Sequence, residues 1–160
     1  MENYFYFMNK ALEQANKALI LDEVPIGAII TYRGKIIATG YNKRNTNKNS
    51  TSHAELIAIS EACNKLGDWR LEECSIYITL EPCPMCAGAI VQARVSTVVY
   101  GAPSPKSGFG GSVINILEMD TLNHRCEVIR NIKKDECSRL LKNYFIQMRK
   151  KSLNSSKVVV

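Results

Sequence analysis

The sequence predicts an α/β fold in which a layered sheet contains at least one parallel pair of strands. The chain has 160 residues, of which 46% are hydrophobic, so it is long enough to bury roughly 70% of its unfolded surface. Its middle alternates between strand-like and helix-like segments, the pattern that right-handed crossovers between parallel strands produce. No repeat or linker interrupts the pattern, which predicts one domain over residues 1–150.

The first predicted elements are a helix and a hairpin. Residues 3–21 carry apolar side chains at helical spacing, which predicts a buried face that includes Phe5, Met8 and Leu12. The β-branched run 25–30 and residues 35–41 flank Arg33-Gly34, so we expect two antiparallel strands.

The remaining elements follow from periodicity and from end signals. Gly67 favours a helix end and Pro84 a helix start. We predict helices over 53–66, 84–93 and 135–150, and strands over 75–80, 95–100 and 126–129. Polar loops occupy 42–51 and 102–112, and residues 151–160 are expected to form a frayed tail.

The net charge of +6 is concentrated in two places. Residues 121–160 hold ten basic and three acidic side chains, whereas residues 1–120 hold eleven and twelve. A smaller basic run without acids spans residues 33–48. Two basic clusters fit a polyanionic partner, but a solvated helix face followed by a tail explains the charge equally well.

The sequence favours a cytoplasmic protein without a membrane segment. No run approaches the about 20 apolar residues that span a bilayer, and Met1–Tyr4 lack the basic start of a signal peptide. Six cysteines in a chain of this size do not require disulfides. Four of them stand singly and are expected to pack as small apolar side chains: Cys63, Cys74, Cys126 and Cys137.

Two short segments have the composition of a zinc site. The first contains His53 and Glu55, and the second contains Cys83 and Cys86 on either side of Pro84. A catalytic zinc takes three protein ligands and leaves one position for water. Because Cys83 and Cys86 are three residues apart, both sulfurs lie on one side of a helix start, where thiolates are favoured. We predict that these cysteines and His53 bind zinc and that Glu55 transfers protons.

Each part of this pattern has a simpler interpretation. Ser52 and Glu55 match a helix capping box, Cys83 and Cys86 match a redox pair, and a lone histidine is more often structural. A structural zinc would need a fourth ligand, for which the candidates are His124 and the four single cysteines. Only the joint pattern of His-x-Glu and Pro-Cys-x-x-Cys is specific.

These residues resemble the zinc cytidine and adenosine deaminase superfamily, whose signature has this form. Further segments are similar to bacterial tRNA-specific adenosine deaminases, in register from about residue 3 to residue 150: Val24-Pro25-Ile26-Gly27-Ala28, Gly40-Tyr41-Asn42, Gly101-Ala102 and Asn123-His124-Arg125. The resemblance implies a three-layer α/β/α cytidine-deaminase-like fold with a mixed sheet of about five strands. It also implies a homodimer with one Zn²⁺ per subunit that converts the wobble adenosine of a tRNA anticodon stem-loop to inosine.

Residue by residue, the resemblance assigns the zinc to His53, Cys83 and Cys86 and the proton transfer to Glu55. Four more residues are implied in substrate binding: Asn42, Ala54, Lys106 and Phe145. Phe145, Tyr144 and Phe109 are candidates for stacking on bases, although core packing is the ordinary role of such a residue as Phe145.

Two segments depart from the family pattern, namely Ala102–Pro105 and Tyr144–Lys150. Both belong to the expected RNA-binding regions. Two rival functions remain, because other deaminases share this zinc chemistry and because zinc can also be purely structural. One is deamination of a free base or nucleotide such as guanine or cytosine, and the other is a non-catalytic zinc module that binds RNA.

Overall fold

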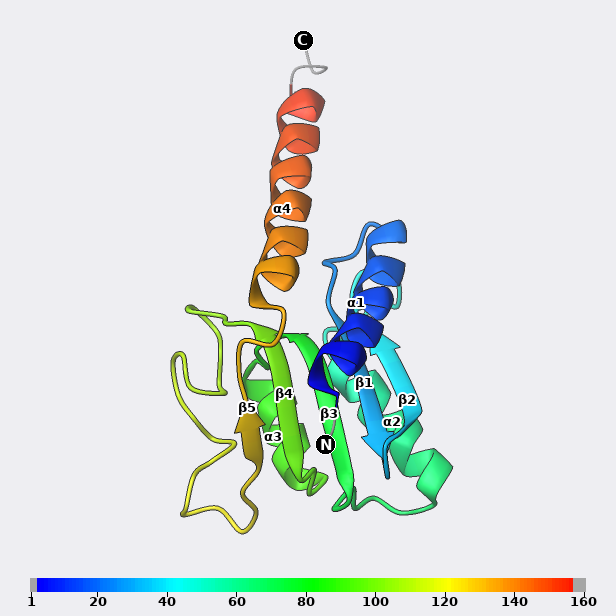
Figure 1. The fold of residues 1–160 in the computed structure, drawn as a ribbon. Helices are drawn as coiled ribbons and strands as arrows, with labels where there is room; N and C mark the ends of the chain where they lie inside the picture. The colour runs from blue at the N-terminus through cyan, green and yellow to red at the C-terminus, as the bar shows by residue number, and fades with distance from the viewer. Residues whose placement is uncertain (1–2, 157–160) are drawn as a thin grey trace.

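The computed structural model describes residues 3–156, which form a five-stranded mixed sheet between two layers of helices (Figure 1). The elements are α1 (Tyr4–Ile20), β1 (Gly27–Tyr32), β2 (Lys35–Tyr41), α2 (Ala54–Leu66), β3 (Cys74–Leu80), α3 (Pro84–Gln92), β4 (Thr97–Ala102), β5 (Glu127–Ile129) and α4 (Lys134–Ser156). The strand order is β2-β1-β3-β4-β5. β1 pairs antiparallel with β2 and β3, whereas β3–β4 and β4–β5 are parallel. The predicted α/β fold and mixed sheet are confirmed.

Alternation along the strands divides the core into two parts. Ile76 and Ile78 of β3 face the apolar cluster beneath α2 and α3. Tyr77, between them, faces the cluster that α1 and α4 cover. Because successive strand residues point to opposite faces, one buried strand holds both helix layers in place.

The helix and turn signals fixed several boundaries. Arg33 and Gly34 both have positive φ angles, 48° and 74°, as a tight two-residue hairpin requires. Gly67 ends α2 with a φ of 68° and donates its amide to the Cys63 carbonyl. Strands β1 and β4 each begin two residues later than predicted. In β4 the cause is that the Val95 amide still donates to the Ile90 carbonyl of α3.

The predicted buried face of α1 was right for Met8, which is buried, and for Leu12, which is partly buried against the core, but wrong for Phe5. The buried side chains are Phe7, Met8, Ala11, Gln14, Ala15 and Ala18, whereas Phe5 is 60% exposed. A Cβ placed on Gly27 of β1 would lie 2.1 Å from the Ala11 carbonyl oxygen. The helix therefore rests directly on the strand through its small residues, and the larger Phe5 side chain is turned away.

Helix α4 is longer than predicted and extends beyond the body of the molecule (Figure 1). We expected a frayed tail from residue 151, but the helix continues to Ser156, while 157–160 lie outside the described residues. Its buried anchors are Cys137 and Tyr144, and the Tyr144 hydroxyl donates to the Asp22 carbonyl after α1. Past this anchor most of the helix is exposed.

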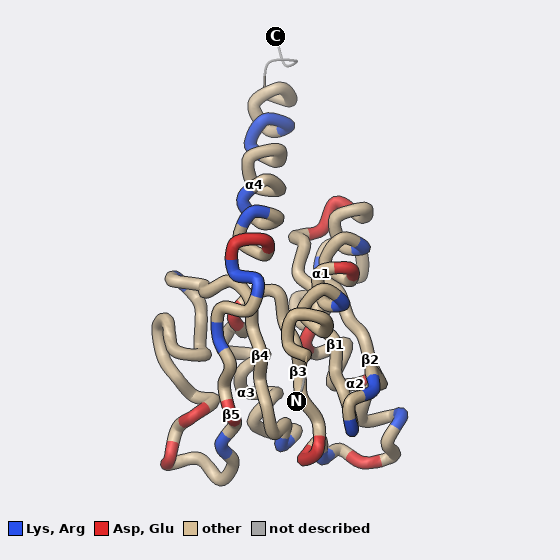
Figure 2. The backbone as a smooth tube through the Cα atoms, in the orientation of Figure 1, with Lys and Arg blue, Asp and Glu red and all other residues tan. Residues whose placement is uncertain are grey.

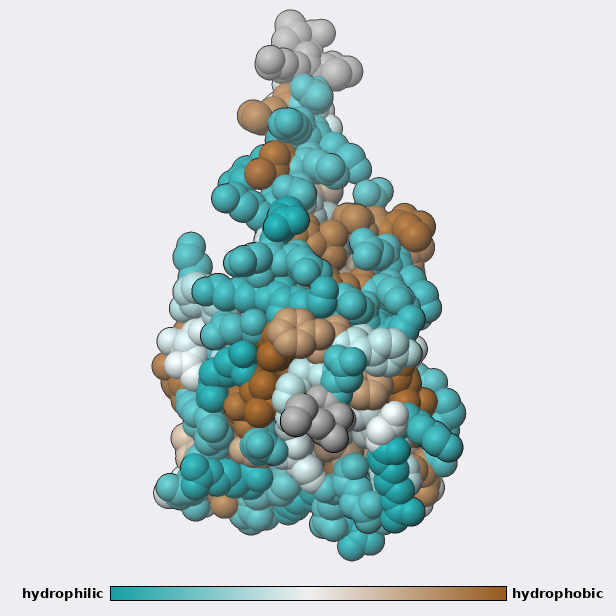
Figure 3. Space-filling view, viewed as in Figure 1, coloured by the Kyte–Doolittle hydropathy of each residue, from teal (hydrophilic) through white to brown (hydrophobic). Residues whose placement is uncertain are grey.

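The surface divides into polar and apolar regions. Basic side chains follow α4 along its length (Figure 2), while apolar atoms gather at the carboxyl end of α1 (Figure 3), where Ile20 and Leu21 are exposed. Within residues 3–156, no helix has both the length and the apolar character needed to cross a membrane.

The smaller basic run is divided by the fold. Arg33 belongs to the hairpin turn, next to Tyr32, which pairs with Cys74 at the amino end of β3. Lys43 and Arg44 lie in the loop that follows β2, at the opposite end of the strands. These residues therefore cannot act as one cluster.

Candidate active site

Two helix N-termini bring three ligand-type side chains together, as the sequence pattern predicted. His53 is the N-cap residue of α2, Cys83 is the N-cap residue of α3, and Pro84 occupies the first turn of α3. The His53 Nδ1 atom lies 3.7 Å from Cys83 Sγ and 3.5 Å from Cys86 Sγ. All three ligand atoms lie within 4.8 Å of one another.

These distances fit a tetrahedral zinc ion. With bonds of about 2.3 Å to sulfur and about 2.0–2.1 Å to nitrogen, tetrahedral angles place a sulfur about 3.6 Å from a nitrogen. The two distances from His53 Nδ1, 3.7 Å and 3.5 Å, agree with that value. The three side chains are therefore positioned to hold a metal without rearrangement.

The two cysteines differ in their electrostatic surroundings. A hydrogen bond from the Cys86 thiol lowers the pKa of Cys83 to about 4. The same contact, together with burial, raises the pKa of Cys86. Hydrogen bonding to Cys83 raises the pKa of His53 above its ordinary value. Thiolates are the form of cysteine that binds zinc, so Cys83 is already in that form at neutral pH.

Glu55 lies in the first turn of α2, two residues beyond His53, and is only 4% exposed. Burial raises the pKa of its carboxyl group to about 7. A general acid–base group works best when its pKa is near the operating pH. Glu55 can therefore both accept and release a proton at neutral pH.

The capping-box interpretation of Ser52 and Glu55 does not hold. The N-cap of α2 is His53, not Ser52, and the Ser52 amide donates to the Asn49 carbonyl, so no capping box forms. Cys83 and Cys86 are free thiols, as are the four other cysteines. Among residues 3–156, the only metal-ligand group is His53, Cys83 and Cys86, and the His124 Nε2 atom instead contacts the Val95 carbonyl oxygen. No fourth ligand of a structural zinc is present in this range.

A cavity of about 330 Å³ opens beside these residues. Its lining comes from the loop before β1, both helix N-termini, the segments after β2, β3 and β4, and α4: Val24, Ile26, Asn42, Arg44, His53, Ala54, Glu55, Leu80, Glu81, Cys83, Ser107 and Phe145. Of the predicted substrate-binding residues, Asn42, Ala54 and Phe145 line the cavity. Lys106 does not, although its neighbour Ser107 does.

Asn42 is held rigidly at the cavity wall. Its side-chain amide donates to the Val24 carbonyl, and its side-chain oxygen accepts from the Arg44 amide. An asparagine amide has two N–H donors and an oxygen with two lone pairs, so one donor and one acceptor position remain. The surrounding backbone fixes the direction in which they point.

The aromatic candidates occupy different environments. Phe145 is 48% exposed and lines the cavity, so core packing is not its role. Tyr144 is buried against α1. Phe109 packs against the core beneath α2 and α3.

Three polar or charged cavity residues were missed by sequence reasoning, namely Arg44, Glu81 and Ser107, as were the apolar residues Val24, Ile26 and Leu80. Arg44 was visible only as part of a basic run. Glu81 directly precedes the Pro-Cys-x-x-Cys motif, which was the one available signal for its position. Ser107 belongs to the loop after β4, which hydrogen bonds to Glu81 and Pro82 tie to the segment after β3.

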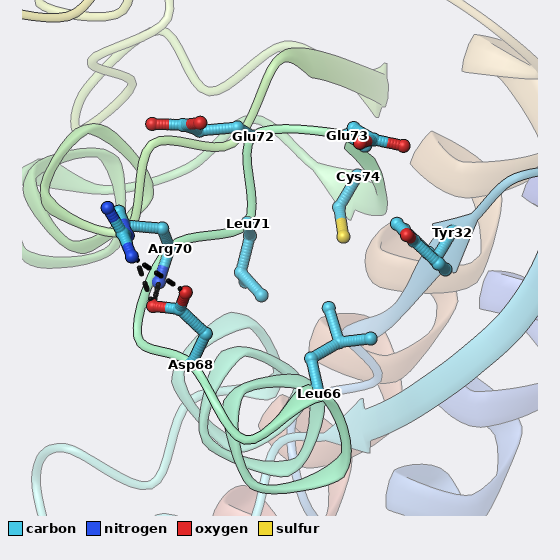
Figure 4. Close-up of a pocket in the computed structure, with 8 residues that line it drawn as sticks. All are labelled: Tyr32, Leu66, Asp68, Arg70, Leu71, Glu72, Glu73 and Cys74. Atoms are coloured by element: carbon cyan, nitrogen blue, oxygen red, sulfur yellow. Dashed lines mark hydrogen bonds and ion pairs between the residues drawn. The ribbon is translucent and has the colours of Figure 1, made fainter.

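A second cavity, of about 380 Å³, lies at the other end of the strands, next to Tyr32 of β1 and Cys74 of β3 (Figure 4). Its charged side chains are partly paired, as in the contact between Asp68 and Arg70. Burial raises the pKa of Cys74, which also lines it, to about 11, so this thiol stays protonated. This cavity lacks the reactive groups of the first.

Comparison with known proteins agrees with the geometry. The family model of the MafB19-like deaminases matches residues 2–149. The tRNA-specific adenosine deaminase of Bacillus subtilis strain 168 is 47% identical over 145 residues, covering 91% of this chain and 90% of that relative.

Two solved structures show the same fold. One comes from a study of A-to-I editing by tRNA:A34 deaminases, with a TM-score of 0.81, 39% identity, and coverage of 85% of this chain and 99% of that one. The other is a guanine deaminase from Nitrosomonas europaea, with a TM-score of 0.79, 26% identity, and coverage of 90% and 85%. With its His-Cys-Cys cluster and its buried glutamate in place, this chain belongs to the tRNA-specific adenosine deaminase family, within the MafB19-like deaminases.

Proposed function

We propose that this protein hydrolyses the 6-amino group of the wobble adenosine in a tRNA anticodon loop, which yields inosine and ammonia, with one zinc ion per subunit. The observation that carries the proposal is the three-ligand cluster next to Glu55 at the base of a cavity. The family relationship supplies the substrate class.

The chain's own groups divide the chemistry between them. His53, Cys83 and Cys86 would hold the zinc ion, which would supply a nucleophile at neutral pH by lowering the pKa of water. Glu55 accepts one proton from the attacking water and delivers it to a ring nitrogen of adenine. It then takes the remaining proton, from the new hydroxyl group on C6, and transfers it to the amine, which leaves as ammonia while the C6 carbonyl forms. Its pKa of about 7 suits both directions of transfer.

The cavity suits a base that has left its stack. A nucleobase inside a duplex cannot reach a buried metal site, so such enzymes act on flipped or single-stranded bases. The free donor and acceptor of Asn42 are placed to read the edge of the base. Phe145 offers an exposed ring at the rim for stacking. Arg44 lines the same cavity and is suited to a nearby phosphate.

We also propose that the chain functions as a homodimer in the cytoplasm. The outer face of α2 carries an open groove lined by Thr51, Ser52, Leu56, Ile57, Ser60, Glu61 and Asn64. A second copy that covered this groove would lie close to the metal site, because Leu56 follows Glu55 directly. Sedimentation of wild type and Ile57→Arg tests this, with a dimer expected for the first and a monomer for the second. Identical sedimentation of the two would contradict this interface.

The substrate is tested by comparing an anticodon stem-loop with free guanine, cytosine and adenosine. We expect inosine in the stem-loop and turnover of each free compound at least 100-fold slower. Faster turnover of a free base would identify a small-molecule deaminase. Binding of the stem-loop without turnover by the zinc-loaded protein would identify a non-catalytic module.

A further inference from the structure

Two carboxylates line the cavity, and their surroundings differ completely. Glu55 lies beside the metal-ligand cluster. Glu81 follows β3, is 2% exposed, and directs both oxygens into the loop after β4. Its Oε1 accepts the amides of Gly110 at 3.0 Å and Ser112 at 2.9 Å. Its Oε2 accepts the amide of Ser104 at 2.8 Å and the Ser112 hydroxyl at 2.5 Å.

These four hydrogen bonds use the whole acceptor capacity of the carboxylate, which is about four lone-pair sites. Glu81 therefore has no free lone pair for a substrate or for proton transfer, although it lines the cavity. Hydrogen bonds to a charged acceptor are stronger than neutral ones, so the group is well suited to fix a loop that has little regular structure of its own.

The loop encloses Glu81 closely. A Cβ on Gly108 would lie 2.3 Å from the carboxyl carbon and one oxygen of Glu81, and a Cβ on Gly110 would lie 3.3 Å from its Cγ. The loop backbone can approach the carboxylate this closely only because glycine occupies these positions. The Phe109 amide adds a bond to the Pro82 carbonyl, so the loop is also tied to the start of the Pro-Cys-x-x-Cys motif.

The loop that surrounds the Glu81 carboxylate also reaches the substrate cavity. Ser107 lines the same cavity as the metal ligands His53 and Cys83, and its hydroxyl contacts that of Ser104, the residue whose amide Glu81 binds. Lys106, next to Ser107, is exposed at the same place. Displacement of the loop would move this wall and leave the metal ligands where they are.

We propose that Glu81 is a positioning residue that holds the segment 104–112 as one wall of the substrate site, and that it takes no part in proton transfer. It thereby sets the affinity for the nucleic acid around the target base. The kinetic part of this proposal rests on the proposed deaminase function, whereas the structural part does not.

The test is hydrogen exchange and steady-state kinetics of zinc-loaded Glu81→Gln. A glutamine has the same shape, but its amide nitrogen must face N–H donors. We expect the amides of Ser104, Gly110 and Ser112 to exchange at least ten-fold faster. The KM for the stem-loop should rise at least five-fold, with kcat within three-fold and zinc content unchanged. Glu73→Gln, an exposed position at the other end of β3, is the matched control and should change none of these.

Gly108→Ala disturbs the same contact from the side of the loop. It provides a second test if the Glu81→Gln variant does not fold. It leaves the carboxylate intact but pushes the loop away, so the same rise in KM is expected. Unchanged exchange, or a fall in kcat at constant KM in either variant, would overturn the proposal. Absence of turnover by wild type would contradict the deaminase assignment alone, because the exchange result does not depend on it.

Discussion

At the scale of single residues, the position of Glu55 explains its chemistry. Its side chain is enclosed by protein, yet it borders the cavity and lies two residues from a metal ligand. Removal from water disfavours the charged carboxylate, and this is the main cause of its raised pKa. A carboxyl group exposed on the same helix would have a lower pKa and would therefore be a weaker acceptor for the proton of water.

Replacement of Glu55 by glutamine should separate metal binding from catalysis. The amide keeps the shape but cannot carry a proton, so we expect kcat to fall by about 10²–10⁴-fold while one zinc per chain is retained. Turnover of the stem-loop and metal analysis of the same sample measure the two effects. Glu72→Gln, an exposed change just before β3, should behave as wild type. Substantial turnover by the zinc-loaded Glu55 variant would contradict the assigned role.

The metal ligands could be predicted from the sequence, whereas the cavity wall could not. His53, Cys83 and Cys86 stand in short local patterns, and each helix start places its own ligand. Glu81 and Ser107 gain their places from contacts between segments more than 20 residues apart. A single carboxylate after a strand gives no sign that four donors from a distant loop will surround it.

At the scale of secondary-structure elements, contacts with glycine set how closely helices approach the sheet. A Cβ on Gly40 of β2 would lie 2.2 Å from the Ala54 carbonyl oxygen, in the first turn of α2. This turn carries both His53 and Glu55. The strand therefore determines where the metal-binding end of the helix lies.

We expect Gly40→Ala to weaken both the fold and the metal site. Because the added methyl group meets backbone, which cannot rotate away, we expect a loss of about 1–3 kcal/mol of unfolding free energy. Urea denaturation measures this loss, and competition with a chelator should show weaker zinc binding. Gly88→Ala in α3, where a Cβ meets nothing within 4 Å, is the control and should be neutral or stabilising. Wild-type zinc affinity in the Gly40 variant would refute this coupling.

An ion pair between Glu118 and Arg130 ties the long loop after β4 to the end of β5. Hydrogen bonding to Arg130 lowers the pKa of the Glu118 carboxyl group. The folded protein therefore favours the ionised form more than the unfolded chain does. This contribution to stability is present above the unfolded pKa of about 4.3 and is lost as the pH falls through the lower, folded pKa.

Glu118→Gln should therefore reduce the fall in stability with acid. Since both side chains are partly exposed, the expected loss at neutral pH is only about 1 kcal/mol. The difference between wild type and variant should shrink as the pH drops below about 4. Urea midpoints measured from pH 3 to pH 7 give this comparison, and a constant difference across the range would exclude the pair as its cause.

Element boundaries were predicted best where the signal is chemical and local. Gly67 and Pro84 fixed helix ends because each has a backbone preference of its own. In α1, Phe5 was placed wrongly in the core because Phe5 and Phe7 both fit helical spacing, and only the close approach of Gly27 selects Phe7. The end of α4 was missed because Ser152–Ser156 are weak helix formers.

At the scale of the whole molecule, basic charge and the cavity lie within reach of one helix. Phe145 of α4 lines the cavity, and the exposed basic residues Lys142, Arg149 and Lys150 lie on the same helix. Phosphates that flank a bound base could meet these side chains. Of the basic residues that the sequence groups into two clusters, those near the cavity therefore belong to α4 and to the loop that holds Lys43 and Arg44.

Neutralising Arg149 and Lys150 with glutamine should weaken stem-loop binding without affecting saturated turnover. Each lost phosphate contact should reduce the slope of log affinity against log salt by about one. Fluorescence anisotropy across a salt series measures this slope. Arg33→Gln, in the turn between β1 and β2 at the other end of the strands, serves as the control. Wild-type salt dependence in the double variant would exclude α4 from the RNA surface.

The projecting end of α4 must be helical before its basic side chains can bind RNA together. Beyond Tyr144 the helix is mostly exposed, and Lys151 ties it to Asp22 through an exposed ion pair at 3.1 Å. Exposed ion pairs contribute little, and short helices with few packing contacts are only marginally stable in water. We therefore expect a bound polyanion to favour the ordered helix, because it would lower the repulsion between the helix cations. Substitutions that carry no charge, such as Asn154→Ala, should then tighten RNA binding by favouring the helix in advance. The affinity of this region for RNA would then depend on the fraction of molecules in which the end of α4 is helical, as well as on the contacts that the helix makes.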